Sequence, residues 1–264
     1  MQEFPATPAV DDAPEVIESG HLWLQEWVVG APLRFRLGDA GLVFGDGART
    51  FDPWEEPVGY RFAARAVRET FDREAFRAAV DAPGDYTFLG VATRFEGVAY
   101  DWDRLPAFLG VDVHAPDRGF RTPDVAEQAF ERLGLAPVNA VSKELPARDF
   151  RPERYEMPAS AYRNGPVAGL LVRNKNGGRA LVVTPAVGAD PPTVDPETLV
   201  EEAVTPERID RVAATLGDGT TVDRVLDRLV ERLVRERYAA LPEPVDADAI
   251  RSAAAESVAR RLST

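Results

Sequence analysis

Short apolar runs separated by turn residues are the feature that most limits what this chain can fold into. In residues 33–37, Leu-Arg-Phe-Arg-Leu, apolar and basic side chains alternate as they do in a half-buried strand. Residues 175–178, Lys-Asn-Gly-Gly, separate two such runs and predict a tight hairpin. The pattern therefore predicts antiparallel strands. The predicted strands lie at residues 21–29, 33–37, 42–44, 86–92, 95–100, 108–113, 167–174 and 179–184.

Helical periodicity appears in two places between these strands and dominates the end of the chain. Residues 60–80 predict one helix or two, Thr122-Pro123 begins another that runs to about residue 133, and residues 141–165 are mixed and rich in loops. After a Pro- and Gly-rich linker, Asp195-Pro196 and Thr205-Pro206 predict two further helix starts. One continuous apolar stripe follows at positions 222, 225, 226, 229, 230, 233 and 234, and a last helix is predicted from about residue 246 to 262. We therefore predict a first domain at 1–187, a linker at 188–195 and a helical C-terminal domain at 196–264.

The composition excludes several kinds of site. The chain has 264 residues and no cysteine, which rules out disulfides and thiolate metal sites, and its two histidines rule out a histidine-rich metal site. No apolar run is long enough to cross a bilayer, and the acidic N-terminus does not resemble a signal peptide. We therefore expect a cytoplasmic protein with no membrane partner.

Acidic residues outnumber basic ones by 44 to 31, which gives a formal net charge of -13. Lys143 and Lys175 are the only lysines, and arginine supplies every other basic side chain. An acidic, lysine-poor chain of this kind is typical of a protein from a high-salt cytoplasm, where a dense carboxylate surface maintains solubility. The net charge then reflects adaptation to a salty solvent, so only local basic patches can indicate whether the protein binds nucleic acid.

Residues 26–34, Glu-Trp-Val-Val-Gly-Ala-Pro-Leu-Arg, have the frame of a known motif. Motif I of the covalent nucleotidyltransferases reads Lys-x-Asp-Gly-x-x-x-Arg, and Gly30 and Arg34 match it at the right spacing. Together with further blocks in the same order, the motif resembles the RNA ligase domain family, and most closely a haloarchaeal type, over most of residues 1–187. The further blocks are residues 20–26, 44–46, 100–102, 105–113 and 173–175.

The resemblance implies an α+β fold. Its core would be the antiparallel two-sheet nucleotidyltransferase (RNA ligase/ATP-grasp-like) core with flanking helices, and the predicted helical C-terminal domain would be added to it. Enzymes of that family attack the α-phosphate of ATP with a neutral lysine amine, and their carboxylates hold the ribose and Mg²⁺. At the matching positions this chain has apolar residues, so the resemblance implies degenerate catalytic motifs with no catalytic or metal-binding residue. These positions are Trp27, Val29, Val91, Ala168 and Leu181.

The resemblance also implies a retained frame for nucleotide or phosphate binding, namely Gly30, Arg34, Arg49, Arg173 and Lys175. A triphosphate would lose its hydration water on entering a pocket lined by apolar side chains, and these side chains would offer no contacts in exchange. We therefore expect the pocket to be partly filled by its own side chains, of which Trp27 is the largest. The alternative for Trp27 is an ordinary strand aromatic. The alternative for Arg34 and Arg49 is that they are ordinary surface arginines and contact no phosphate.

Three functions remain open. The leading hypothesis is an inactive member of the RNA ligase family that binds RNA ends, or an active ligase or other RNA-repair partner, and needs no cofactor. The second is an active ATP-dependent RNA ligase that uses Lys175 as a relocated nucleophile, with ATP and Mg²⁺. The third is a regulatory, protein-binding subunit. An arginine ridge near the C-terminus either follows a phosphate backbone or forms a salt-bridged face with its acidic neighbours. The ridge consists of Arg224, Arg228, Arg232 and Arg235.

Overall fold

The computed structural model describes residues 1–184 and 191–263. It divides into two compact units. The first consists of Met1–Glu56, Ala63–Thr93 and Val98–Val187, and the second of Pro57–Phe62, Arg94–Gly97 and Gly188–Thr264. The predicted boundary at residues 188–195 lies partly outside the described residues and stays a prediction.

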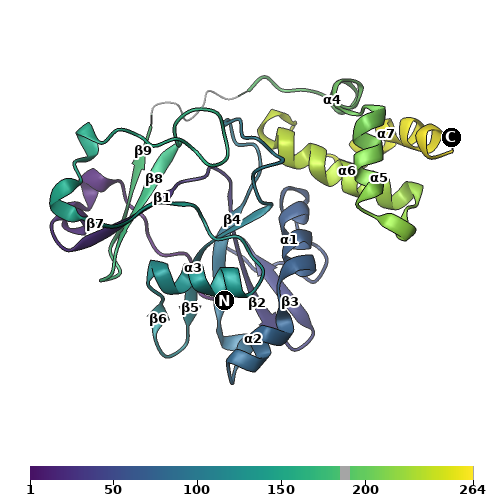
Figure 1. The fold of residues 1–264 in the computed structure, drawn as a ribbon. Coiled ribbons are helices and arrows are strands. Elements are labelled where there is room, and N and C mark those ends of the chain that lie inside the picture. The colour runs from purple at the N-terminus through teal and green to yellow at the C-terminus, as the bar shows by residue number, and fades with distance from the viewer. Residues whose placement is uncertain (185–190, 264) are drawn as a thin grey trace. The chain divides into compact units, whose positions relative to one another are not determined.

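The first unit contains two antiparallel sheets and flanking helices, so its class is α+β (Figure 1). One sheet has the strand order β7-β1-β8-β9, and the other has the order β3-β2-β4-β5-β6. The strands are β1 (His21–Glu26), β2 (Ala31–Gly38), β3 (Gly41–Gly45), β4 (Thr87–Ala92), β5 (Phe108–Ala115), β6 (Gly119–Phe120), β7 (Ala140–Pro146), β8 (Gly169–Asn174) and β9 (Arg179–Val183). The helices are α1 (Val58–Thr70), α2 (Arg73–Ala79) and α3 (Pro123–Arg132), of which α1 begins in the second unit.

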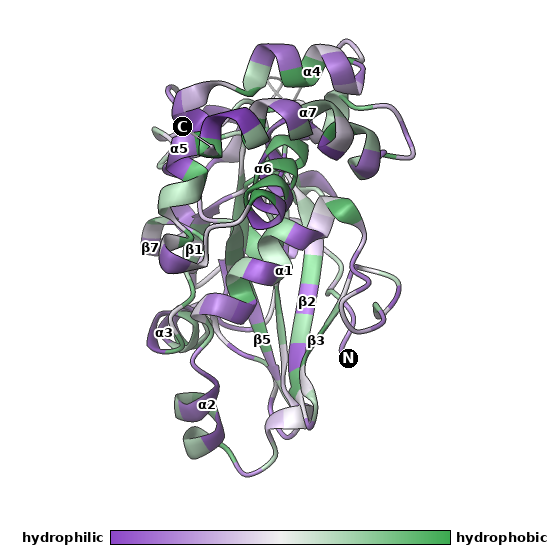
Figure 2. Cartoon of the chain, turned by 90° about the vertical axis from the view of Figure 1, so that its right-hand side faces the viewer, coloured by the Kyte–Doolittle hydropathy of each residue, from purple (hydrophilic) through white to green (hydrophobic). Residues whose placement is uncertain are grey.

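An aromatic core fixes the helices of this unit to one face of the five-stranded sheet. Phe35 of β2 stacks on Phe88 of β4 with ring centroids 5.0 Å apart, and Phe71 lies edge-on to both. Phe130 of α3 lies 5.9 Å from Phe88. Leu33, Phe35 and Leu37 are all buried, so the apolar positions of this alternating run face the core. Figure 2 shows the alternation of hydropathy as changing colours along β2.

Three predictions about strands need correction. Residues 95–100 are not a strand, because β4 pairs directly with β5 and the side chains of Val98 and Tyr100 are buried as part of a loop. Residues 140–146, which were assigned to a loop-rich stretch, form β7 at the edge of the four-stranded sheet. Strand β1 ends at Glu26 and not at residue 29.

The second unit is built mainly from α4 (Pro196–Ala203), α5 (Pro206–Ala214), α6 (Val222–Arg237) and α7 (Ala247–Leu262) (Figure 1). The predicted caps of α4 and α5 form: Asp195 accepts the backbone N–H of residue 198 at 2.9 Å, and Thr205 accepts that of residue 208 at 3.3 Å. The apolar stripe of α6 is buried against α4, α5 and α7, except that Val222 in the first turn is exposed. Across the described residues, none of the helices is long and apolar enough to span a membrane.

Candidate functional site at the end of strand β1

The segment that follows β1 is held by backbone contacts inside the first unit. The backbone N–H of Trp27 donates to the carbonyl of Gly169 at 3.0 Å, and that of Val29 donates to the phenol oxygen of Tyr100 at 2.9 Å. A Cβ added to Gly169 would lie 2.9 Å from Cε3 of Trp27. The indole therefore rests against Gly169, where a side chain would not fit without a shift.

Three of the five degenerate positions meet in one apolar cluster. Ala168 is 1% exposed, and Trp27 and Val29 are partly buried against the same group of side chains. Mg²⁺ requires hard oxygen ligands and phosphates require positive charge, and these three side chains supply neither, since the indole N–H of Trp27 is a neutral donor. These three positions therefore supply no ligand for the metal ion of a triphosphate–Mg²⁺ complex. The other members of the cluster are Val28, Val98, Tyr100, Trp102, Leu105, Leu109, Ala136 and Tyr162.

The remaining two degenerate positions lie apart from this cluster. Val91 of β4 abuts Gly30, since a Cβ on that glycine would lie 2.7 Å from Cγ1 of Val91. Leu181 of β9 pairs with Leu171, two residues along β8 from Gly169, and its N–H donates to the carbonyl of residue 8 at 2.8 Å. Val91 therefore lies beside Gly30 of the motif, whereas Leu181 lies further along the four-stranded sheet.

A buried carboxylate lies beside the cluster, and sequence reasoning overlooked it. Glu26 is 1% exposed, and its carboxylate accepts hydrogen bonds from Asn139 Nδ2 at 3.0 Å, from the backbone N–H of Ala161 at 3.0 Å and from the Ser160 hydroxyl. These three hydrogen bonds satisfy a polar group that would be costly to bury without partners. The one signal in the sequence was a charged residue within the apolar run that leads into the motif.

Two tyrosines near Glu26 have perturbed acidity. Burial raises the pKa of Tyr100 to about 12, and the negative charge of Glu26 acts in the same direction. Burial and the same carboxylate raise the pKa of Tyr162 to about 12 as well. Both phenols are therefore neutral near pH 7, so neither supplies a base.

Two arginines of the predicted frame lie in different surroundings. Arg34 is 4% exposed, and its Nη1 donates to the carbonyl of Gln2 at 2.9 Å, so the N-terminal segment occupies it. Arg49 is exposed in the loop after β3, with Nε 3.7 Å from a carboxylate oxygen of Asp46. Phosphate contact by either residue stays a prediction.

Arg173 and Lys175 lie at the far end of β8 from Ala168. Arg173 is 3% exposed and pairs with Asp112 at 2.6 Å. The amine of Lys175 is exposed at the β8–β9 turn, 3.0 Å from Glu144, whose hydrogen bond raises the pKa of the amine. A raised pKa lowers the fraction of neutral amine, which is the nucleophilic form.

The other lysine is also paired with a carboxylate. Lys143 is exposed on β7 and pairs with Glu127 at 2.6 Å. Neither lysine belongs to the apolar cluster around Trp27. Within residues 1–184 and 191–263, no group of three or more His, Asp or Glu side chains is arranged to hold a metal ion.

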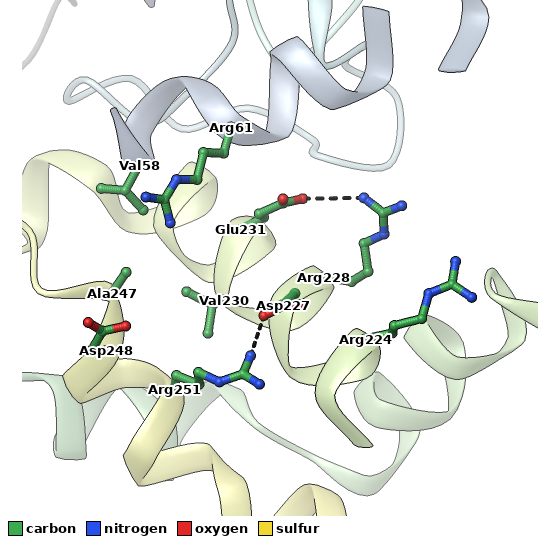
Figure 3. A pocket seen from close by; sticks show the side chains of 10 residues that line it. All are labelled: Val58, Arg61, Arg224, Asp227, Arg228, Val230, Glu231, Ala247, Asp248 and Arg251. Carbon is green, nitrogen blue, oxygen red and sulfur yellow. Dashed lines mark hydrogen bonds and ion pairs between the residues drawn. The ribbon is translucent and has the colours of Figure 1, made fainter. Parts of the chain in front are cut away.

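A second candidate site is a cavity of about 340 Å³ in the helical unit (Figure 3). Arg251 donates to Asp223 at 2.7 Å and to Asp227, and Arg228 lies 3.7 Å from Glu231. These pairs leave little net charge in the cavity and favour the salt-bridged interpretation of the arginine ridge. Its lining residues are Val58, Arg61, Arg224, Asp227, Arg228, Val230, Glu231, Ala247, Asp248 and Arg251.

The two remaining arginines of the ridge are engaged elsewhere in the same unit. The guanidinium carbons of Arg232 and Arg235 lie 5.9 and 4.8 Å from the ring centroid of Phe62. Arg235 is 6% exposed. Two of the four arginines of the ridge therefore pack on an aromatic ring.

Comparison with known proteins identifies the fold. A Naegleria gruberi RNA ligase solved with pyrophosphate superposes on 70% of this chain with a TM-score of 0.51 and 12% identity. An archaeal ATP-dependent RNA ligase covers 100% of the chain with a TM-score of 0.50 and 13% identity. This chain spans 56% and 62% of the lengths of those two proteins. No family model and no curated protein matches the sequence. The chain therefore has an RNA ligase-like nucleotidyltransferase fold.

Proposed function

We propose that this protein is a catalytically inactive relative of the RNA ligases that binds RNA ends without forming a lysyl-AMP intermediate. The observation that carries the proposal is the composition of the site after β1. Trp27, Val29 and Ala168 form part of one apolar cluster where the resemblance requires a lysine, an aspartate and a glutamate. Arginine, the main basic residue of this chain, cannot replace that lysine, because a guanidinium stays protonated.

The distribution of lysine supports the same conclusion. The chain has two lysines, Lys143 and Lys175, and each is exposed and paired with a carboxylate. An active ligase that uses Lys175 would need this side chain to leave Glu144, lose its proton and reach a bound nucleotide. The observed contacts oppose the first two of these steps.

A salt-adapted origin, of the haloarchaeal type, belongs to the proposal. The net charge of -13 and the near absence of lysine support it. In such a cytoplasm, RNA binding would rest on contacts that survive screening, such as buried guanidinium groups and stacking, rather than on long-range attraction.

Adenylation separates the inactive protein from the active ligase. The protein is incubated with Mg²⁺ and ATP labelled on the α-phosphate at high salt, and then run on a denaturing gel. We expect no labelled protein, because no neutral amine lies in the site. A labelled band that disappears in the Lys175→Ala variant, but not in Lys143→Ala, would establish the active-ligase alternative instead.

Binding to RNA ends is tested with linear and circular RNA of the same sequence. We expect the linear form to bind at several salt concentrations and the circular form to bind at least about tenfold more weakly, a difference of about 1.4 kcal/mol. Equal binding of the linear and circular forms would mean that the protein has no preference for RNA ends. Unchanged mobility of both, together with co-purification of another protein, would favour the regulatory-subunit alternative.

A further inference from the structure

A small polar cavity lies in the first unit where the β8–β9 hairpin meets the start of α3. Its volume is about 40 Å³, enough for a few water-sized groups and too small for a nucleoside. Arg121, Arg173, Lys175 and Arg179 line it, and none of its described lining residues is acidic. In a chain with a net charge of -13, this is a local concentration of positive charge.

The floor of the cavity contains an unbalanced buried charge. Arg173 Nη2 lies 2.6 Å from one carboxylate oxygen of Asp112, and Arg179 Nη1 lies 2.7 Å from the other. The two arginine side chains are 3% and 8% exposed, and the aspartate is 2% exposed. Two guanidinium groups thus share one carboxylate, which leaves one positive charge without a partner in a desolvated place. Such a charge is costly unless an anion compensates it.

Donors remain available on two of the arginines. Arg173 is nearly saturated, since it also donates to the carbonyls of Val111 and Arg121 and to Gln25. Arg179 uses two of its five N–H groups on Asp112, and the other three have no acceptor among the described residues. The half-buried guanidinium of Arg121 likewise has no hydrogen-bond or ion-pair partner within the described part of the chain.

The walls of the cavity are fixed by their own contacts. The side-chain oxygen of Asn174 accepts the backbone N–H groups of Asn176 and Gly178 at 3.0 and 2.9 Å, which holds the hairpin. The ring of Phe120 lies 5.5 Å from the guanidinium carbon of Arg179 and restricts its orientation. In the first turn of α3, a hydrogen bond from Thr122, aided by nearby backbone N–H groups, lowers the pKa of the Asp124 carboxyl, so the start of this helix already carries a negative charge.

We propose that this cavity binds a phosphate group, held by Arg179 and Arg121. A guanidinium matches two phosphate oxygens at once, and the spare N–H groups of both residues have no other described acceptor. The group is either inorganic phosphate or the terminal phosphate of an oligonucleotide. Strand pairing sets Arg173 opposite Trp23 and Leu170 opposite Glu26, so the cavity and the apolar cluster lie at opposite ends of β1. The proposal does not depend on RNA-end binding by the cluster.

The first test compares inorganic phosphate with chloride at equal ionic strength, using calorimetry and the unfolding temperature. We expect phosphate binding to saturate and Arg121→Gln to weaken it about tenfold, because a charge-assisted hydrogen bond is lost. Arg179→Lys, which keeps the charge but loses the two-pronged geometry, is expected to weaken it by a similar factor. Arg118→Gln removes the same charge from the exposed turn before β6 and is the matched control, expected to stay within about twofold.

Two results of this test would overturn the proposal. One is an equal response of the wild-type protein to phosphate and chloride, which would mean a general salt effect. The other is an equal loss in Arg121→Gln and Arg118→Gln, which would mean that net charge and not the cavity attracts phosphate.

A competition experiment identifies the source of the phosphate. Short single-stranded RNAs with a 5′-phosphate or a 5′-hydroxyl compete against inorganic phosphate. Competition by the phosphorylated RNA alone supports the site and assigns it to an RNA end. Competition by neither supports it as a site for the free ion. Equal competition by both contradicts a cavity of this size, because an internal backbone phosphate carries a nucleoside on each side.

Discussion

Replacing Asp112 by asparagine removes the carboxylate that two buried guanidinium groups share. Arg173 and Arg179 would then remain 3% and 8% exposed with no anionic partner from the cluster. Breaking a buried pair in this way costs about 3–5 kcal/mol, because a desolvated charge loses its compensation. Since about 1 kcal/mol shifts the unfolding temperature by about 2–4 °C at this size, we expect a decrease of about 6–20 °C.

The decrease is measured by tryptophan fluorescence during heating in phosphate-free buffer, because a bound anion would mask part of it. Trp23 pairs with Arg173 across neighbouring strands and therefore reports on this part of the sheet. Asp117→Asn, in the exposed turn after β5, makes the same change of charge and is expected to cost less than about 0.5 kcal/mol. A loss below about 1 kcal/mol for Asp112→Asn, or a loss equal to that of the control, would refute the reasoning.

Two further predictions concern the apolar cluster. Folding raises the pKa of Tyr100 from 10.0 to about 12, so the folded state holds this proton more tightly. The associated stability is therefore complete below pH 10 and falls between pH 10 and 12, by up to about 3 kcal/mol. Titration of tyrosinate absorbance checks this, and the idea fails if all six tyrosines of the chain titrate together near pH 10. Trp27→Lys is expected to destabilise the first unit by about 3–5 kcal/mol, as a large aromatic is lost and an amine is buried, and to give no labelled protein with ATP. Recovery of adenylation in this variant alone would show that the missing carboxylates are not needed.

Local chemistry made part of the fold predictable. The hairpin at residues 175–178 is determined by its own turn residues, and the caps at Asp195 and Thr205 are determined by side chains three residues from their partners. The apolar stripe of α6 was readable because its period matches that of a helix. The exposed Val222 shows that the helical period identifies the apolar face of α6, but not how far along α6 the neighbouring helices cover that face.

Long-range contacts account for what the sequence did not reveal. Strand β7 has three consecutive polar residues at its centre and an irregular register, and it is a strand because it pairs with β1 more than a hundred residues earlier. The donors to Glu26 lie at residues 139, 160 and 161, so its burial could not be inferred from its neighbours. Residues 95–100 are the opposite case, because they resemble a strand in sequence but form a loop. Their apolar side chains Val98 and Tyr100 fill the cluster around Trp27. The same holds for the cavity at the hairpin, whose charge depends on Asp112 in the other sheet.

The two margins of the four-stranded sheet are each closed to further strands. At β7, Glu144 adopts a left-handed backbone with φ of 58°, and the pairing with β1 shifts register, so the outer edge of this strand is neither straight nor regular. At β9, the N-terminal segment forms a parallel bridge between Ala9 and Leu181. The first ten residues therefore cover the edge of β9. A chain without them would expose this edge strand to pairing with strands of neighbouring molecules.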